Sequence, residues 1–209
     1  MVGPRLTKHS ILITRRPSTK LRTSSLVVAA VLAFIGPASA ADYIIDTKGG
    51  HASINFRIPH LGYSWLVGRF DTFSGTFSYD ATNPAAARIS VEIDTASLNS
   101  NHAERDKHLR GADYLDAAQF PKASFITKSV TPKGAGKADI TGDLTLRGVT
   151  KTVTIAAEAI GGGNDPWGGV RQGFSGRTTL VLVDFGIIKE LGPASKQVEL
   201  DLQVEGIRK

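Results

Sequence analysis

The chain has 209 residues, of which 25 are lysine or arginine, 19 are aspartate or glutamate, and none is cysteine. Six of the basic residues and none of the acidic ones lie in residues 1–40, so the rest of the chain carries 19 of each sign and no formal net charge. This balance argues against a nucleic-acid-binding domain and against a surface that binds anionic membranes, because both need a basic face. The absence of cysteine excludes thiolate zinc sites and iron–sulfur clusters.

Residues 1–40 have the features of an export signal. Four of their basic side chains precede a short apolar run: Arg15, Arg16, Lys20 and Arg22. The run, residues 26–35, is shorter than the ~20 residues that span a bilayer. Residues 38–40 read Ala-Ser-Ala, a small-x-small cleavage site. We therefore predict cleavage after Ala40, a mature domain over residues 41–209, and a periplasmic location.

In the mature region, apolar and polar residues alternate with a period of two, which is typical of strands with one buried face. The pattern covers eight segments: 52–58, 73–79, 89–93, 123–130, 140–146, 149–157, 174–182 and 198–204. Phe70 is out of phase with the second segment, which predicts a bulge near Asp71. Eight or nine strands on mostly short connections predict one all-β domain, with an antiparallel sheet that is closed on itself or folded over.

Residues 101–110 differ from the rest because they are rich in charge and favour a helix. Asn101 is placed to cap the first turn, Glu104 to complete a capping box, and Gly111 to end the helix in a left-handed conformation. A single helical insert in an all-β domain is expected to shape one end of the sheet structure.

The interior of an eight-stranded barrel is either filled by side chains or able to hold one small ligand. Seven residues on the apolar parity of their strands are predicted to face it: Phe56, Ile58, Phe77, Leu144, Leu146, Val153 and Ile155. Overall composition favours a filled core. Small residues on the same parity, Gly75, Gly142 and Ala157, favour a lined cavity.

Support for catalysis or metal binding is slight. His102 and Asp106 are four residues apart, as are Glu104 and His108, so each pair can meet on a helix face. The two histidines are six apart and do not share a face. A solvated, salt-bridged helix explains this cluster, and a polar functional site is the alternative. Trp65 and Trp167 lie in glycine-rich segments that we expect to be loops, where each either plugs the core or covers a cavity.

Several longer segments resemble the YceI family. They are residues 55–58, 60–65, 101–110, 142–151, 165–169 and 191–195, with shorter matches at 68–70 and 75–77. The resemblance covers nearly all of residues 41–209. It implies a lipocalin-like antiparallel barrel of eight strands with an elongated apolar pore. It also implies a polyisoprenoid ligand, such as a quinone tail or a polyprenyl phosphate, and no established catalytic residues.

Binding, carriage or storage of an isoprenoid would need no cofactor, metal, nucleic acid or stable membrane insertion, although transient membrane contact is compatible with it. A polar head group loses hydration on burial unless polar partners receive it. We expect those partners at His60, His102, Arg105 and Trp167, with Trp65 as a cover. Two alternatives stay open. One is an enzyme that acts on a bound lipid through His102, Glu104, Asp106 and His108. The other is a stress protein with a filled, ligand-free barrel. The sequence indicates no particular oligomeric state.

Overall fold

The computed structural model describes residues 1–3, 40–189 and 192–209. The basic and apolar parts of the predicted export signal therefore lie outside the described residues. The chain divides into two units, Met1–Gly36 and Pro37–Lys209, and the second contains every helix and strand of the described residues. None of these helices is long and apolar enough to cross a membrane.

Among the described residues, eleven strands form one antiparallel sheet. The strands are β1 (Ala41–Ile45), β2 (Ser53–His60), β3 (Ser64–Phe70), β4 (Phe73–Tyr79), β5 (Arg88–Asp94), β6 (Leu98–Asn99), β7 (Lys122–Gly134), β8 (Lys137–Leu146), β9 (Val149–Asn164), β10 (Val170–Val181) and β11 (Gln197–Arg208). One α-helix, α1 (Ala103–Arg110), and three short 3-10 helices, η1 (Pro84–Ala86), η2 (Thr95–Ser97) and η3 (Leu182–Phe185), complete the fold.

The first six strands form three interrupted strands of the barrel: β1 with β2, β3 with β4, and β5 with β6. β1 and β2 both pair with β11, at its two halves. β4 pairs with β1, and β3 pairs with β2. On the other side of these strands, β5 pairs with β4, and β6 pairs with β3. Counted in this way, the sheet is an eight-stranded barrel closed by β1 against β11. The bulge predicted near Asp71 is instead a break in the strand, because the chain leaves the strand conformation between β3 and β4.

β1 and β3 do not stand out in the sequence as strands. β1 has only five residues, too few to show a period of two. The glycine-rich sequence around Trp65 predicts a loop, but Ser64–Phe70 form β3, and Trp65 pairs with Pro59 of β2. The Gly161–Gly163 run lies at the end of β9 and pairs with β10, so it forms part of the β9–β10 hairpin.

Glycines on the inner face allow aromatic rings to lie against the barrel wall. A Cβ atom on Gly142 would collide with the ring of Phe125, and one on Gly206 would collide with the ring of Phe77. Gly142 therefore does not enlarge the interior as expected, since a phenyl ring takes up its space. Around these rings the core forms three apolar clusters, which are centred on Phe56, Phe125 and Phe77.

The helical insert forms where it was predicted, but its ends differ from the prediction. The N-cap is His102, whose Nδ1 accepts a hydrogen bond from the backbone N–H of Arg105 at 3.2 Å. Asn101 precedes the cap with a positive φ of 61°. Gly111 ends the helix with a φ of −72°, so the predicted left-handed conformation is wrong.

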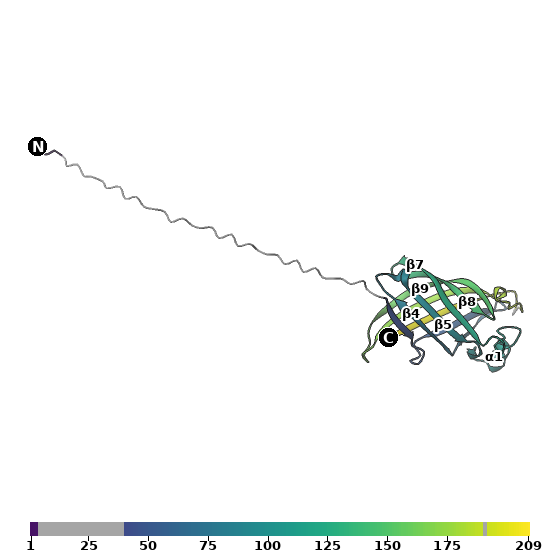
Figure 1. Cartoon of the computed structure of the whole chain (residues 1–209). Helices are drawn as coiled ribbons and strands as arrows, with labels where there is room; N and C mark the ends of the chain where they lie inside the picture. The colour runs from purple at the N-terminus through teal and green to yellow at the C-terminus, as the bar shows by residue number, and fades with distance from the viewer. Residues whose placement is uncertain (4–39, 190–191) are drawn as a thin grey trace. The chain divides into compact units, whose positions relative to one another are not determined.

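The two ends of the barrel differ in what covers them. We call the end with α1 the helix end; it carries residues 61–63, 100–121, 147–148, 182–189 and 192–196. The other we call the open end; it carries residues 80–87, 135–136 and 165–169. Antiparallel neighbours place successive connections at opposite ends in this way. Figure 1 shows α1 beyond one end of the strands and the C-terminus near the other.

Candidate ligand-binding site

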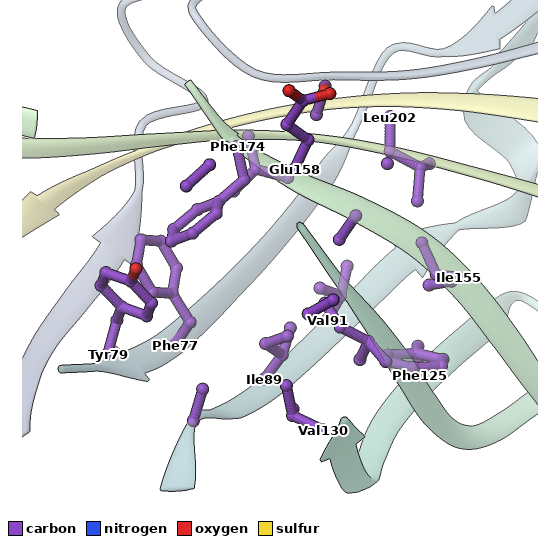
Figure 2. Close-up of a pocket in the computed structure, with 18 of the residues that line it drawn as sticks. Phe77, Tyr79, Ile89, Val91, Phe125, Val130, Ile155, Glu158, Phe174 and Leu202 are labelled. Atoms are coloured by element: carbon purple, nitrogen blue, oxygen red, sulfur yellow. The ribbon is translucent and has the colours of Figure 1, made fainter. Parts of the chain in front are cut away.

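A cavity of about 280 Å³ lies inside the barrel. Its wall is almost wholly apolar and includes Phe77, Val91, Val153 and Ile155. Figure 2 shows Phe77, Tyr79 and Phe174 grouped on one side, with Ile89, Val91, Val130 and Phe125 facing the same space. Ring contacts join the residues of the aromatic side. Phe174 packs edge to face on Phe77, with ring centroids 5.5 Å apart, and on Tyr79, with ring centroids 4.9 Å apart.

A second cavity of about 130 Å³ lies further along the barrel, toward the helix end. It has no polar wall, and its lining includes Phe56, Ile58 and Leu146. Four residues line both cavities: Ile54, Ile93, Leu144 and Leu200. The two cavities therefore lie end to end along the barrel, and these four side chains form a waist between them. We call the two cavities together the bore.

The bore reaches the surface at the open end. Its wall there includes exposed Ala81 and Gly136, in the β4–β5 and β7–β8 connections, and exposed Pro132 and Gly134 at the end of β7. In contrast, no residue around the smaller cavity is exposed. Its far wall is formed by Tyr114, Leu115 and Ile187, whose side chains are buried. The bore is therefore open at one end and floored at the other.

Hydrogen bonds donated by two arginines, together with one ion pair, hold the floor in place. Arg147, in the β8–β9 turn, donates to the carbonyl of Gly186 at 3.0 Å and to that of Ala112 at 2.8 Å. Arg110 donates to the Leu98 carbonyl, and Lys189 pairs with Asp113. The segment after α1 and the segment after η3 are thus joined to each other and to the barrel.

Few polar groups face the bore. Thr178 lines it, but its hydroxyl donates to the carbonyl of Thr154 at 2.8 Å. Tyr79 also lines the larger cavity, near the open end, and its hydroxyl makes no hydrogen bond to the described residues. Tyr79 is therefore a polar group that a ligand in the bore can reach.

All seven residues predicted to face the interior line the bore. Phe77, Val153 and Ile155 lie in the larger cavity, Phe56, Ile58 and Leu146 in the smaller one, and Leu144 at the waist. Whether they contact a ligand stays a prediction.

The residues predicted to hold a head group or cover the cavity do not line the bore: His60, Trp65, His102, Arg105 and Trp167. His60 ends β2 and is exposed. Trp65 is 47% exposed and stacks on the Arg57 guanidinium at 4.4 Å. Trp167 is 74% exposed and lies at the open end against Arg171, 5.4 Å from ring to guanidinium.

The His102–His108 cluster does not converge on one point. Asp106 is buried and accepts hydrogen bonds from the backbone N–H and the hydroxyl of Ser100. Burial raises the pKa of Asp106, but these hydrogen bonds outweigh it and the pKa lies below its ordinary value. Arg105 also donates to Ser100, and His108 packs edge to face on Tyr114 at 5.0 Å. These contacts fasten α1 to the barrel.

A partly buried ion-pair cluster on the wall near the open end gave no signal in the sequence. Arg171 Nη1 lies 2.7 Å from Asp46 and 2.5 Å from Glu205, and its Nε lies 2.8 Å from Asp165. The hydrogen bond from Arg171 lowers the pKa of Asp46 to about 2. Asp46, His51 and Glu205 are close enough to share a cation, but the guanidinium already occupies the carboxylates. We therefore interpret the cluster as structural.

A groove of about 890 Å³ runs over the outer face of β2, β3, β10 and β11. Its charged residues are paired across the strands: Arg57 with Glu199 at 2.6 Å, and Arg177 with Asp201 at 3.0 Å. Both arginines are exposed, and carboxylates neutralise their charge. The groove therefore prefers an anionic ligand less strongly than the bore prefers an apolar one.

Residues 43–206 match the YceI-like domain family. The chain belongs to the YceI family. It is 59% identical to the UPF0312 protein of Shewanella sp. (strain ANA-3) over 172 residues, which is 82% of this chain and 90% of that protein. It is 57% identical to the UPF0312 protein of Shewanella baltica (strain OS155 / ATCC BAA-1091) over 186 residues, 89% of this chain and 97% of that protein.

Solved structures share the fold of this barrel. The YceI protein of Campylobacter jejuni superposes with a TM-score of 0.65 at 29% identity, covering 73% of this chain and 90% of that one. BcnA of Burkholderia cenocepacia superposes with a TM-score of 0.69 at 21% identity, covering 77% and 98%. A polyisoprenoid binding domain from Saccharophagus degradans gives 0.57 at 16% identity, covering 81% and 99%. The expected eight-stranded YceI barrel is thereby confirmed.

Proposed function

We propose that this YceI-family protein is exported to the periplasm and there binds one polyisoprenoid chain inside its barrel, for carriage or storage. The observation that carries the proposal is the apolar bore, two cavities in line that meet at Leu144, with an opening at one end. Every CH2 group that moves from water into such a bore contributes about 0.8 kcal/mol. A long isoprenoid tail therefore gains most of its binding free energy from burial alone.

Two further observations support an isoprenoid over a short apolar ligand. The bore extends past the waist at Leu144 into the smaller cavity, so it suits an elongated molecule. The structurally similar domain from Saccharophagus degradans is a polyisoprenoid binding domain. At 16% identity this similarity concerns the fold, and we carry the ligand over only as a proposal.

Binding without catalysis fits the distribution of polar groups. A general acid or base has to lie within hydrogen-bond reach of the reacting atom. His102, Glu104 and His108 are exposed, Asp106 is bonded to Ser100, and none of these four residues lines the bore. We therefore propose that the protein is not an enzyme.

The deciding experiment is mass spectrometry of lipids extracted from protein purified from its native periplasm. We expect an isoprenoid in the wild type and its loss in Leu144→Trp, because an indole at the waist would block both cavities. Ile126→Trp is the matched control, since Ile126 is an exposed, outward-facing strand residue (59% exposed). A folded wild-type protein that carries no lipid, or a Leu144→Trp variant that carries as much lipid as wild type, would contradict the proposal.

Export is tested separately. We expect the N-terminus of protein recovered from the periplasm to be Ala41, as the basic, apolar and Ala-x-Ala parts of residues 1–40 predict. Recovery of protein that begins at Met1 would reject this part of the proposal.

A further inference from the structure

The floor of the bore has a feature that a simple lipid-binding cavity does not require. It is built from two separate segments, Tyr114–Leu115 after α1 and Ile187 after η3, and both are fixed by several hydrogen bonds. The backbone N–H of Leu115 donates to Leu109 at 3.1 Å, and that of Ile187 donates to Leu182 at 3.2 Å. Arg147 then joins the two segments through the carbonyls of Ala112 and Gly186.

The side chains of this floor are tightly packed. Tyr114, Leu115 and Ile187 are 4%, 8% and 6% exposed and pack in one apolar cluster with Phe56 and Leu98. A buried side chain in such a cluster moves only if its neighbours repack. An apolar chain that reaches the floor is therefore stopped by it.

The bore also has a defined length. β8 has 10 residues and follows the barrel from the open end to the helix end. At about 3.3 Å per residue and a tilt of about 40°, such a strand covers roughly 25 Å of the barrel axis. A chain longer than the bore has to leave carbon atoms in water at the open end, and each exposed CH2 group forfeits its burial free energy.

We infer that the floor formed by Tyr114, Leu115 and Ile187 sets the longest isoprenoid chain that the protein encloses, and that the chain enters tail first through the open end. This inference rests on the proposed function. It adds the orientation of the ligand and a residue-level cause for selection by length. The polar end of the ligand then lies at the open end, beside Tyr79, and not at the helix end.

The test is competitive loading. Purified protein is stripped of lipid and offered an equimolar series of all-trans isoprenoid alcohols, from geraniol to solanesol. Mass spectrometry of the extracted complex gives the bound distribution. In wild type we expect bound alcohol to increase with chain length up to a limit and then to stop increasing, because carbons beyond the limit stay in water.

Floor variants should move that limit. Ile187→Ala and Leu115→Ala deepen the bore, so the ratio of the next longer alcohol to the limiting one should rise on the order of tenfold. Ile187→Phe should move the limit to a shorter alcohol. Ile188→Ala is the matched control, because Ile188 is the adjacent residue of the same type but 78% exposed. It should leave the distribution unchanged. Thermal unfolding verifies that each variant is folded, and Ile187→Val replaces Ile187→Ala if the latter is not.

The outcomes separate the two claims. If wild type loads none of the alcohols, the proposed function fails. If wild type loads the alcohols but shows no limit of chain length, the floor does not set that limit, although the protein binds isoprenoids. The same conclusion follows if the limit is the same in all folded floor variants. Val130→Ala enlarges the bore near the open end, where Val130 is buried. A limit that moves in Val130→Ala and not in Ile187→Ala would show that the tail points toward the open end, which would also overturn the inference.

Discussion

The two ends of this barrel use charged side chains in different ways. At the open end, Arg171 joins Asp46, Glu205 and Asp165, which belong to strands or turns that are already neighbours in the wall. Its ion pairs reinforce the wall and leave the bore clear. At the helix end, Arg147 binds carbonyls of two connections that follow α1 and η3. These bonds hold apolar residues across the end of the bore, so the same type of side chain stabilises an opening in one place and a closure in the other.

Removing the closing arginine should have the largest effect. Arg147→Ala takes away two hydrogen bonds from a charged donor to carbonyls, and we expect a loss of about 3 kcal/mol in the free energy of unfolding. Arg88→Ala is the matched control at the open end, because exposed Arg88 also donates to two carbonyls, those of Ala86 and Ala87, but within its own turn. It should cost less than about 0.5 kcal/mol. Urea unfolding measures both, and equal losses would contradict the difference between the ends.

The wall network at the open end should make stability depend on acid pH. The pKa of Asp46 is held at about 2, below its ordinary 3.8, chiefly by Arg171. A carboxylate with a lowered pKa in the folded state contributes stability above its ordinary pKa, and this contribution is lost as the pH falls through the folded value. Asp46→Asn should therefore lower the free energy of unfolding by about 2 kcal/mol at neutral pH, and the difference from wild type should shrink between about pH 4 and pH 2.

A matched carboxylate at the helix end serves as the control for that measurement. Asp184 is exposed, and Asp184→Asn should leave the free energy of unfolding close to wild type. A difference between wild type and Asp46→Asn that stays constant down to about pH 2 would mean that the ion pair with Arg171 does not contribute through the charge of Asp46.

A smaller effect is expected from the accessible hydroxyl of Tyr79 in the bore. Tyr79→Phe should weaken a ligand with a hydrogen-bonding head group by about 1 kcal/mol, roughly fivefold in Kd, and leave an unsubstituted isoprenoid hydrocarbon unaffected. Tyr63→Phe, at the helix end and 86% exposed, is the control. Titration of an isoprenoid alcohol against the corresponding hydrocarbon measures the difference. Equal affinities of Tyr79→Phe and wild type for the alcohol would place the polar end away from Tyr79.

The sequence predicted the wall of this barrel better than its ends. Alternation identified eight strand segments and the inward parity of residues such as Leu144 and Val153, because a period of two is a local property. It missed β3, where Trp65 and Val67 are apolar but face outward and so hide the alternation. Which end is open depends on contacts between distant segments, such as Arg147 with Ala112, and no local pattern carries that information. The aromatic rings over Gly142 and Gly206 depend on cross-strand packing in the same way.

The smallest expected effect separates the two candidate positions for a head group. The charged insert suggested His102 and Arg105, whereas the bore opens at the other end of the barrel.

His102 caps α1 through its Nδ1, so His102→Ala should cost about 0.5 to 1 kcal/mol of stability, as the loss of a helix cap does. Because α1 contributes only the apolar Leu109 to the lining of the bore and His102 does not line it, we expect the affinity for an isoprenoid alcohol to stay within twofold of wild type. Glu104→Ala, on the same helix but exposed, is the control for surface charge. A tenfold loss of affinity for the alcohol in folded His102→Ala, with the hydrocarbon bound as before, would move the head group to the helix end and reverse the ligand in the barrel.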